Sequence, residues 1–178
     1  MSGADGSVAG RLLSVDAVCS RDLLPAARKL LQARDGEGGF STWDASNIFY
    51  ELHKLEQHNL PSARTLLLLY AADLRFRLRW EILPALEEGQ VVVAIPYLET
   101  GIAFGLANGL PEKWINEVFR FAPAATESFW LNGSPSQTAS SDGFLEFCMD
   151  LMPSDFFQRF SAHFVELQKC GRCKLLQL

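Results

Sequence analysis

Apolar residues along the chain follow two spacings, and stretches of the two kinds alternate. Short apolar runs are typical of buried strands, and the pattern predicts strands at 11–18, 40–44, 91–95, 127–131 and 173–178. Between them, apolar residues recur every three or four positions, which predicts helices over 22–34, 47–57, 62–87, 111–121 and 144–168, the last broken near Pro153. Because strands and helices alternate, we expect an α/β domain with a mainly parallel sheet flanked by helices.

The helix predicted over 62–87 is unusual because apolar side chains lie on two of its sides. Leu66, Tyr70 and Leu83 belong to one set, and Leu67, Leu74 and Leu78 add a second. A helix that is apolar on two sides has to bury both. We therefore expect one side to cover the sheet and the other to contact a second copy of the chain, giving a homodimer.

Composition and charge narrow the class of protein. The chain has 178 residues, of which 48% are hydrophobic, and this is enough for a single core. We expect a flexible N-terminus at 1–10 and a single domain over 11–178. A formal net charge of -5 argues against nucleic acid as a partner. No apolar run approaches the roughly 18 residues that span a bilayer, and the N-terminus lacks a signal-like pattern, so we expect a cytoplasmic protein without membrane contact.

Two consecutive segments carry a resemblance to a known family. Residues 67–73 read Leu-Leu-Leu-Tyr-Ala-Ala-Asp, and 82–93 read Ile-Leu-Pro-Ala-Leu-Glu-Glu-Gly-Gln-Val-Val-Val. This order resembles the thymidylate kinase family, in which a Leu-Leu-Phe/Tyr-Ala-Ala-Asp-Arg helix leads through a Pro-Ala-Leu-x-x-Gly turn into a strand. Segments 96–104 and 155–167 continue the resemblance, which covers 11–178. It implies a three-layer P-loop-kinase-like fold with a truncated lid and C-terminus.

The resemblance places the family's phosphate loop on 16–25, where the sequence departs from the family pattern. A phosphate loop works through inward-facing backbone N–H groups, a Lys on the phosphates and a Ser/Thr on magnesium. Here the Lys position falls on Leu23 and the Ser/Thr position on Leu24, and no glycine is present. We interpret this segment as a degenerate phosphate loop made of Cys19, Ser20, Arg21, Asp22, Leu23 and Leu24.

Other positively charged groups that the family uses are also replaced. The Asp-Arg pair at the end of the third strand corresponds to Ile95-Pro96, and the Arg after Ala-Ala-Asp corresponds to Leu74. The segment in place of the Arg-rich lid, 133–143, contains no Lys or Arg. Phosphoryl transfer depends on positioned positive charge. The resemblance therefore implies a kinase fold without a working ATP site.

Arginines on the long helix do not restore that charge. Arg75 and Arg79 share one side of the predicted helix, whereas Arg77 points elsewhere, next to Glu81 at the i+4 position. The three guanidinium groups therefore cannot form one clamp. We interpret them as a solvated helix face with one ion pair.

Several polar residues fall where the family has site residues. The candidates for a remnant acceptor site, which would bind a nucleoside, nucleotide or other small molecule, are Asp16, Asp44, Asp73, Tyr97 and Glu99. The other explanation is that these residues serve packing or helix capping, or are polar because they face the solvent. Cys170 and Cys173 have the spacing of a redox or zinc half-site. The pair ends a helix, and Cys19 and Cys148 could complete a zinc site only if the fold brought all four cysteines together. We therefore predict no metal site and no catalytic residue.

The sequence therefore predicts a thymidylate kinase-like protein that has lost catalysis, a pseudokinase that acts by binding or regulation and needs no cofactor. The alternative is an active nucleoside monophosphate kinase, with an unorthodox donor site, that transfers phosphate from ATP to dTMP and uses Mg²⁺. A sensor of a small ligand is a third possibility.

Overall fold

The structure is a computed structural model of the chain. It describes residues 10–18, 20–33, 38–54, 61–131, 143–148 and 152–176. Three predictions fall wholly or mostly outside these ranges: the flexible N-terminus at 1–10, Cys19 of the degenerate loop, and the 133–143 loop.

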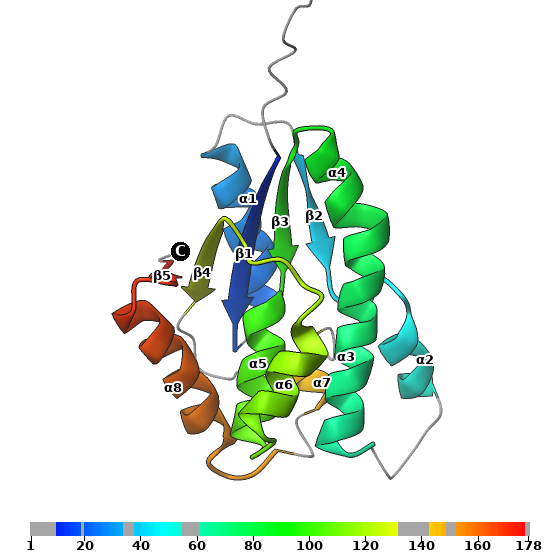
Figure 1. The fold of residues 1–178 in the computed structure, drawn as a ribbon, viewed down its shortest axis with the longest axis vertical. Helices are drawn as coiled ribbons and strands as arrows, with labels where there is room; N and C mark the ends of the chain where they lie inside the picture. Colours follow the sequence, from blue (N-terminus) through cyan, green and yellow to red (C-terminus); the bar gives the residue numbers. More distant parts are fainter. Residues whose placement is uncertain are drawn as a thin grey trace, which may run out of the picture.

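Parallel strands form a single five-stranded sheet in the described part of the chain, in the order β2-β3-β1-β4-β5 (Figure 1). All four neighbouring pairs are parallel, so the predicted parallel sheet is confirmed. The bounds are β1 Arg11–Ala17, β2 Gly38–Thr42, β3 Val91–Ile95, β4 Glu127–Leu131 and β5 Lys174–Leu175. The prediction of a strand over 40–44 was two residues late, because residues 43–46 form a turn.

Helices cover both faces of the sheet and give the expected three layers (Figure 1). One face buries Leu13, Val15 and Val93 against α1, and the other buries Leu12, Val92 and Trp130 against the remaining large helices. Every residue of β3 is buried, as predicted for a strand covered on both sides. The helices are α1 Leu23–Gln32, α3 Ala63–Arg77, α5 Leu98–Ala107, α6 Glu112–Phe119 and α8 Phe156–Lys169.

The long helix predicted over 62–87 is confirmed as one continuous rod with an irregular middle. Ser62 caps its first turn by accepting a hydrogen bond from the Thr65 N–H at 3.3 Å. After α3 comes a π-helical turn, Leu78–Ile82, which continues into α4, Leu83–Glu87. Its inner side lies in the core, and its outer side leaves four large apolar side chains exposed: Leu68, Phe76, Trp80 and Leu83.

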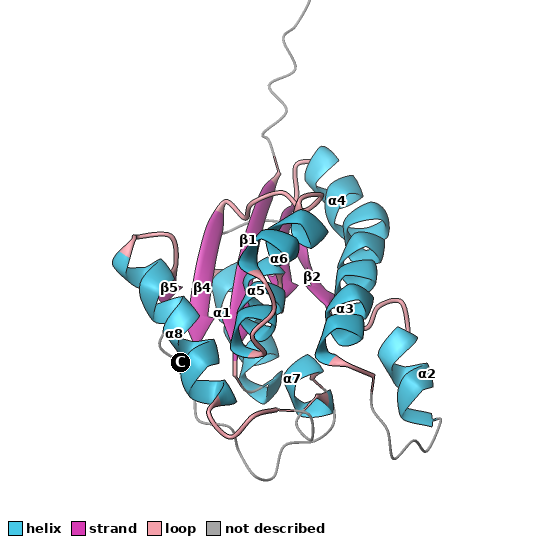
Figure 2. Ribbon diagram, turned by 60° about the horizontal axis from the view of Figure 1, so that its bottom comes forward, coloured by secondary structure: helices cyan, strands magenta, loops and turns pink. Residues whose placement is uncertain are grey.

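Two short helices lie at one end of the molecule. Figure 2 shows α2, Ile48–Lys54, outside the sheet layers next to α3. Helix α7, Phe144–Phe147, packs near the loop that follows β1. It is separated from α8 around Pro153, as the sequence predicted. Within the described ranges, no helix combines the length and the hydropathy that crossing a bilayer requires.

Candidate functional site

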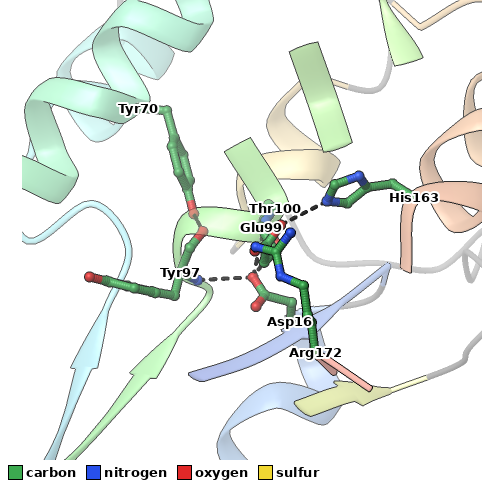
Figure 3. Close-up of polar contacts among 7 residues, drawn as sticks. All are labelled: Asp16, Tyr70, Tyr97, Glu99, Thr100, His163 and Arg172. Atoms are coloured by element: carbon green, nitrogen blue, oxygen red, sulfur yellow. Dashed lines mark hydrogen bonds and ion pairs between the residues drawn. The ribbon is translucent and has the colours of Figure 1, made fainter. Parts of the chain in front are cut away.

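Most of the predicted site residues lie at or next to the carboxyl ends of the strands. Open parallel sheets bind ligands at this edge. The structure brings Asp16, Tyr97 and Glu99 together between β1, β3 and the first turn of α5 (Figure 3). Asp44 and Asp73 form a second group at the loop after β2.

Asp16 is the central group of the first cluster, and it is 1% exposed. Its Oδ1 accepts hydrogen bonds from the Tyr97 N–H at 3.0 Å, the Thr100 N–H at 3.2 Å and the Thr100 hydroxyl at 2.7 Å. Two of these donors are backbone groups at the start of α5, so Asp16 caps that helix from a neighbouring strand. Its other oxygen, Oδ2, is buried with no hydrogen-bond partner among the described residues.

The environment of Asp16 favours its protonated form. Burial raises the pKa of this carboxyl from 3.8 to about 6, and the nearby Glu99 adds a smaller upward effect. The hydrogen bonds from Thr100 and Tyr97 act in the opposite direction. A buried carboxyl group with a raised pKa at a sheet edge is typical of binding or catalytic sites.

Glu99 links α5 to the C-terminal part of the chain. Its Oε2 lies 2.7 Å from His163 Nε2 on α8, and its Oε1 lies 3.7 Å from an Arg172 guanidinium nitrogen (Figure 3). The Glu99 and His163 side chains are largely buried, whereas Arg172 is 70% exposed. The contacts of Glu99 therefore hold α8 and the turn after it against the site.

Tyr97 is held at both ends by structural hydrogen bonds. The Tyr70 hydroxyl donates to the Tyr97 carbonyl at 2.6 Å, and the Tyr97 hydroxyl donates to the Pro123 carbonyl at 2.8 Å. Burial raises the pKa of both phenols. Because the Tyr97 hydroxyl is committed to Pro123, its side chain serves packing in this conformation.

Asp44 and Asp73 organise the turn between β2 and α2. Asp44 has a positive φ of 56° and accepts hydrogen bonds from the Phe49 and Tyr50 N–H groups, both at 2.8 Å, which caps α2. Asp73, on α3, accepts from the Asp44 N–H at 3.0 Å and from the Ser46 N–H at 2.9 Å. Burial, with a smaller contribution from Asp73, raises the pKa of Asp44.

The segment predicted to be a degenerate phosphate loop makes one short 3-10 turn, Ser20–Asp22, that runs into α1. Leu23, the first residue of α1, is buried in the core, and Leu24 is 37% exposed. The side chain of Arg21, like the whole of Cys19, lies outside the described part of the structure.

A small cavity lies beside that turn among the described residues. Its volume is only about 20 Å³, which is room for about one water molecule. It is enclosed largely by apolar side chains from β1, α1, α7 and the turn after β2: Ala17, Ser20, Leu23, Trp43, Pro96, Thr100, Gly143, Phe144 and Leu145.

Arg77 overturns the prediction of a solvated helix face. It is 0% exposed, and its Nε donates to the Ser41 hydroxyl at 2.9 Å while an Nη donates to the Ser41 carbonyl at 2.7 Å. The Ser41 hydroxyl in turn donates to Glu81 at 2.6 Å. Helical periodicity cannot reveal this contact, because the partner is on β2, 36 residues away.

Cys170 and Cys173 are not bonded to each other: both are free, the first exposed and the second buried. Burial, with smaller effects of Asp16 and Glu99, raises the pKa of Cys173 to about 12. Its thiol is therefore protonated at neutral pH and is a poor nucleophile or metal ligand. Among the described residues, no group of three or more potential ligands is placed to hold a metal ion.

The sequence did not predict a cavity of about 510 Å³ that lies next to Asp44. Trp43, Asp44 and Asn47 come from the turn after β2, and α2 supplies Phe49, Tyr50 and His53, with Phe147 from α7. The four aromatic side chains of the lining could have indicated this cavity in the sequence. They belong to three separate segments, however, so the sequence does not show that they lie together.

Comparisons with known proteins agree with the fold. No protein-family model matches the chain. A probable thymidylate kinase of Pyrococcus abyssi is 43% identical over 80 residues, 45% of this chain and 33% of that protein. The thymidylate kinase of Bacillus cereus strain ATCC 14579 is 35% identical over 107 residues, 57% of this chain and 50% of that protein. The crystal structure of thymidylate kinase from Ehrlichia chaffeensis superposes with a TM-score of 0.71 at 13% identity, covering 94% of this chain and 93% of that one.

Strand order, layers and structural similarity together define a P-loop-kinase-like α/β protein. The sequence matches go further and show that the chain is related to the thymidylate kinase family. In these matches the chain spans one third to one half of the length of the curated relatives.

Proposed function

We propose that this chain is a thymidylate kinase-related protein that does not transfer phosphate and acts by binding. The observation that carries the proposal is the small size of the cavity beside the Ser20–Asp22 turn, about 20 Å³ among the described residues. A triphosphate needs a cradle of backbone N–H groups and a cation at this point. Leu23 is instead part of the core, and Phe144 and Leu145 line the remaining space.

The other positive charges do not compensate for this loss. Ile95-Pro96 stands at the end of β3, where the resemblance implies an Asp-Arg pair. Arg77 is used inside the protein, on Ser41, and is therefore not free to hold a phosphate. Because phosphoryl transfer is catalysed mainly by positioned positive charge, this supports a protein without kinase activity and without a need for ATP or Mg²⁺.

A coupled ADP-release assay with ATP, Mg²⁺ and dTMP tests this proposal. We expect the wild-type protein to give no more ADP than an Asp16→Asn variant purified in the same way, since a contaminating kinase would act equally in both samples. The alternative, an active thymidylate kinase with an unorthodox donor site, is supported by the names of the relatives. Turnover by the wild type that the variant lacks would establish that alternative.

We also propose that the chain forms a homodimer through the outer side of the α3–α4 rod. Leu68 is 47% exposed, Trp80 63% and Leu83 42%. Together with Phe76, these side chains follow helical spacing, so they form one apolar stripe. Exposed apolar patches of this kind mark interaction surfaces.

A Trp80→Glu substitution is expected to convert the dimer to a monomer, because it places a charge in the middle of an apolar interface. Light scattering after size-exclusion chromatography measures the mass. Val165→Glu, at a 44% exposed position on α8, is the matched control and should stay dimeric. A monomeric wild type at about 100 µM, well above the Kd of a stable dimer, would refute the interface.

Cys170 and Cys173 have the spacing of a disulfide pair and are nevertheless not bonded to each other, which supports the expectation of a reducing, cytoplasmic location. A nucleoside or nucleotide ligand stays a prediction.

A further inference from the structure

The cavity of about 510 Å³ beside α2 has the size of a small-molecule site. It lies where the turn after β2, the first turns of α2 and the short helix α7 meet. It is separate from the small cavity beside the Ser20–Asp22 turn, although Trp43 lines both.

Aromatic rings form one connected wall of this cavity. Phe49, which is 1% exposed, stands at its centre, with its ring centroid 5.0 Å from that of Trp43 and 5.3 Å from that of Phe147. Tyr50 is 55% exposed and supplies the outer part of the wall. Packing between the rings of Trp43, Phe49 and Phe147 fixes the orientation of these three, so this part of the wall is pre-formed.

The charge of the lining is negative. Asp44 contributes a carboxylate that the Phe49 and Tyr50 N–H groups hold in place, and the residues that line the cavity in the described structure include no Lys or Arg. A phosphorylated ligand would meet a carboxylate, because the Lys54 ammonium next to Tyr50 is not part of the lining and is paired with Glu51 at 3.1 Å. The net charge of the chain, -5, also favours positively charged ligands.

Aromatic faces and a carboxylate are together the lining that recognises organic cations. The ring face carries the negative part of the quadrupole, and an alkylated ammonium loses little hydration when it contacts that face. Tyr50 already makes such a contact within the chain, because the Lys54 ammonium lies 4.1 Å from its ring centroid.

We propose that this cavity binds an organic cation, a quaternary or protonated amine, between the rings of Trp43, Tyr50 and Phe147 and the carboxylate of Asp44. The proposal goes beyond the proposed function because it assigns a ligand class to a site that loss of phosphoryl transfer does not define. Binding is measured without turnover, so the failure of either idea leaves the other standing.

Choline and 3,3-dimethylbutan-1-ol are the probes, because they have nearly the same shape and only choline is charged. In calorimetric titrations of the full chain, we expect choline to bind saturably and at least about fivefold more tightly than the neutral alcohol. Tyr50→Leu should weaken choline binding by about threefold or more, whereas Tyr50→Phe, which keeps the ring face, should leave it within about twofold. Tyr50 is 55% exposed, so both variants should fold, which far-UV circular dichroism checks.

Three outcomes would overturn the proposal. One is the absence of saturable choline binding up to about 50 mM, the range of very weak complexes. A second is equal affinity for choline and the neutral alcohol, which would make the cavity merely apolar. A third is binding of thymidine or dTMP with choline silent, which would assign the cavity to a nucleoside or nucleotide instead.

Discussion

Replacing Arg77 with alanine is expected to lower the free energy of unfolding by about 3–5 kcal/mol. The side chain is 0% exposed, so its removal leaves a cavity between β2 and the long helix. It also leaves the Ser41 carbonyl and hydroxyl without their donors. Chemical denaturation followed by circular dichroism measures the change.

Arg75→Ala is the matched control, because it removes the same kind of side chain from an exposed position two residues earlier. Arg75 lies over the Phe121 ring at 5.3 Å from the centroid, a contact that contributes about 0.5–1 kcal/mol. Similar losses for the two variants would mean that the buried contact with Ser41 does not stabilise the interface between β2 and α3.

Replacing Asp16 with asparagine is expected to raise stability at pH 7.5, by roughly 1–3 kcal/mol. The pKa of Asp16 is about 6 in the folded chain, against 3.8 as the ordinary value. Between about pH 4 and 6 the folded state holds a proton that the unfolded state has lost, so stability falls as the pH rises through this window. Above about pH 6, Asp16 is ionised in the folded state, and the full desolvation penalty of this buried charge lowers the stability. Asparagine keeps an oxygen to accept from Tyr97 and Thr100 without that charge.

Denaturation midpoints from pH 3.5 to 8 test this expectation, with Asp155→Asn as the control. Asp155 is an exposed aspartate paired with Arg159, and its loss should change stability only slightly. The wild type and the control should lose stability between about pH 4 and 6, and the Asp16→Asn curve should be flatter there. A variant that is less stable than the wild type at pH 7.5, with an unchanged slope, would show that the Asp16 carboxylate is stabilising.

Periodicity predicted most elements, and it missed one helix that positions the site. Helix α5 contains seven buried residues, and the three on its partly exposed side, Leu98, Ile102 and Leu106, are apolar too. A helix without a polar face has no helical period to detect. Close packing in the tertiary structure explains the glycine at position 101, because a Cβ there would lie 2.5 Å from the Phe119 ring.

The sequence could predict where the site residues lie in the fold, but not which residues they contact. The resemblance placed Asp16 and Glu99 at the sheet edge, and the structure puts them there. It could not indicate that Asp16 would cap α5 or that Glu99 would contact His163, because these partners are 84 and 64 residues away in the chain. The prediction that Arg77 is exposed to solvent was wrong for the same reason. The pattern of residues on one helix carries no information about a strand that packs against it.

Our central proposal is that the ATP-binding space of this kinase-like fold is closed. Calorimetric titration with ATP, with and without Mg²⁺, measures it most directly, with an active thymidylate kinase as the positive control. The small cavity at Leu23, Phe144 and Leu145 predicts no saturable heat in either condition. Saturable one-to-one binding of ATP that strengthens with Mg²⁺ would contradict it.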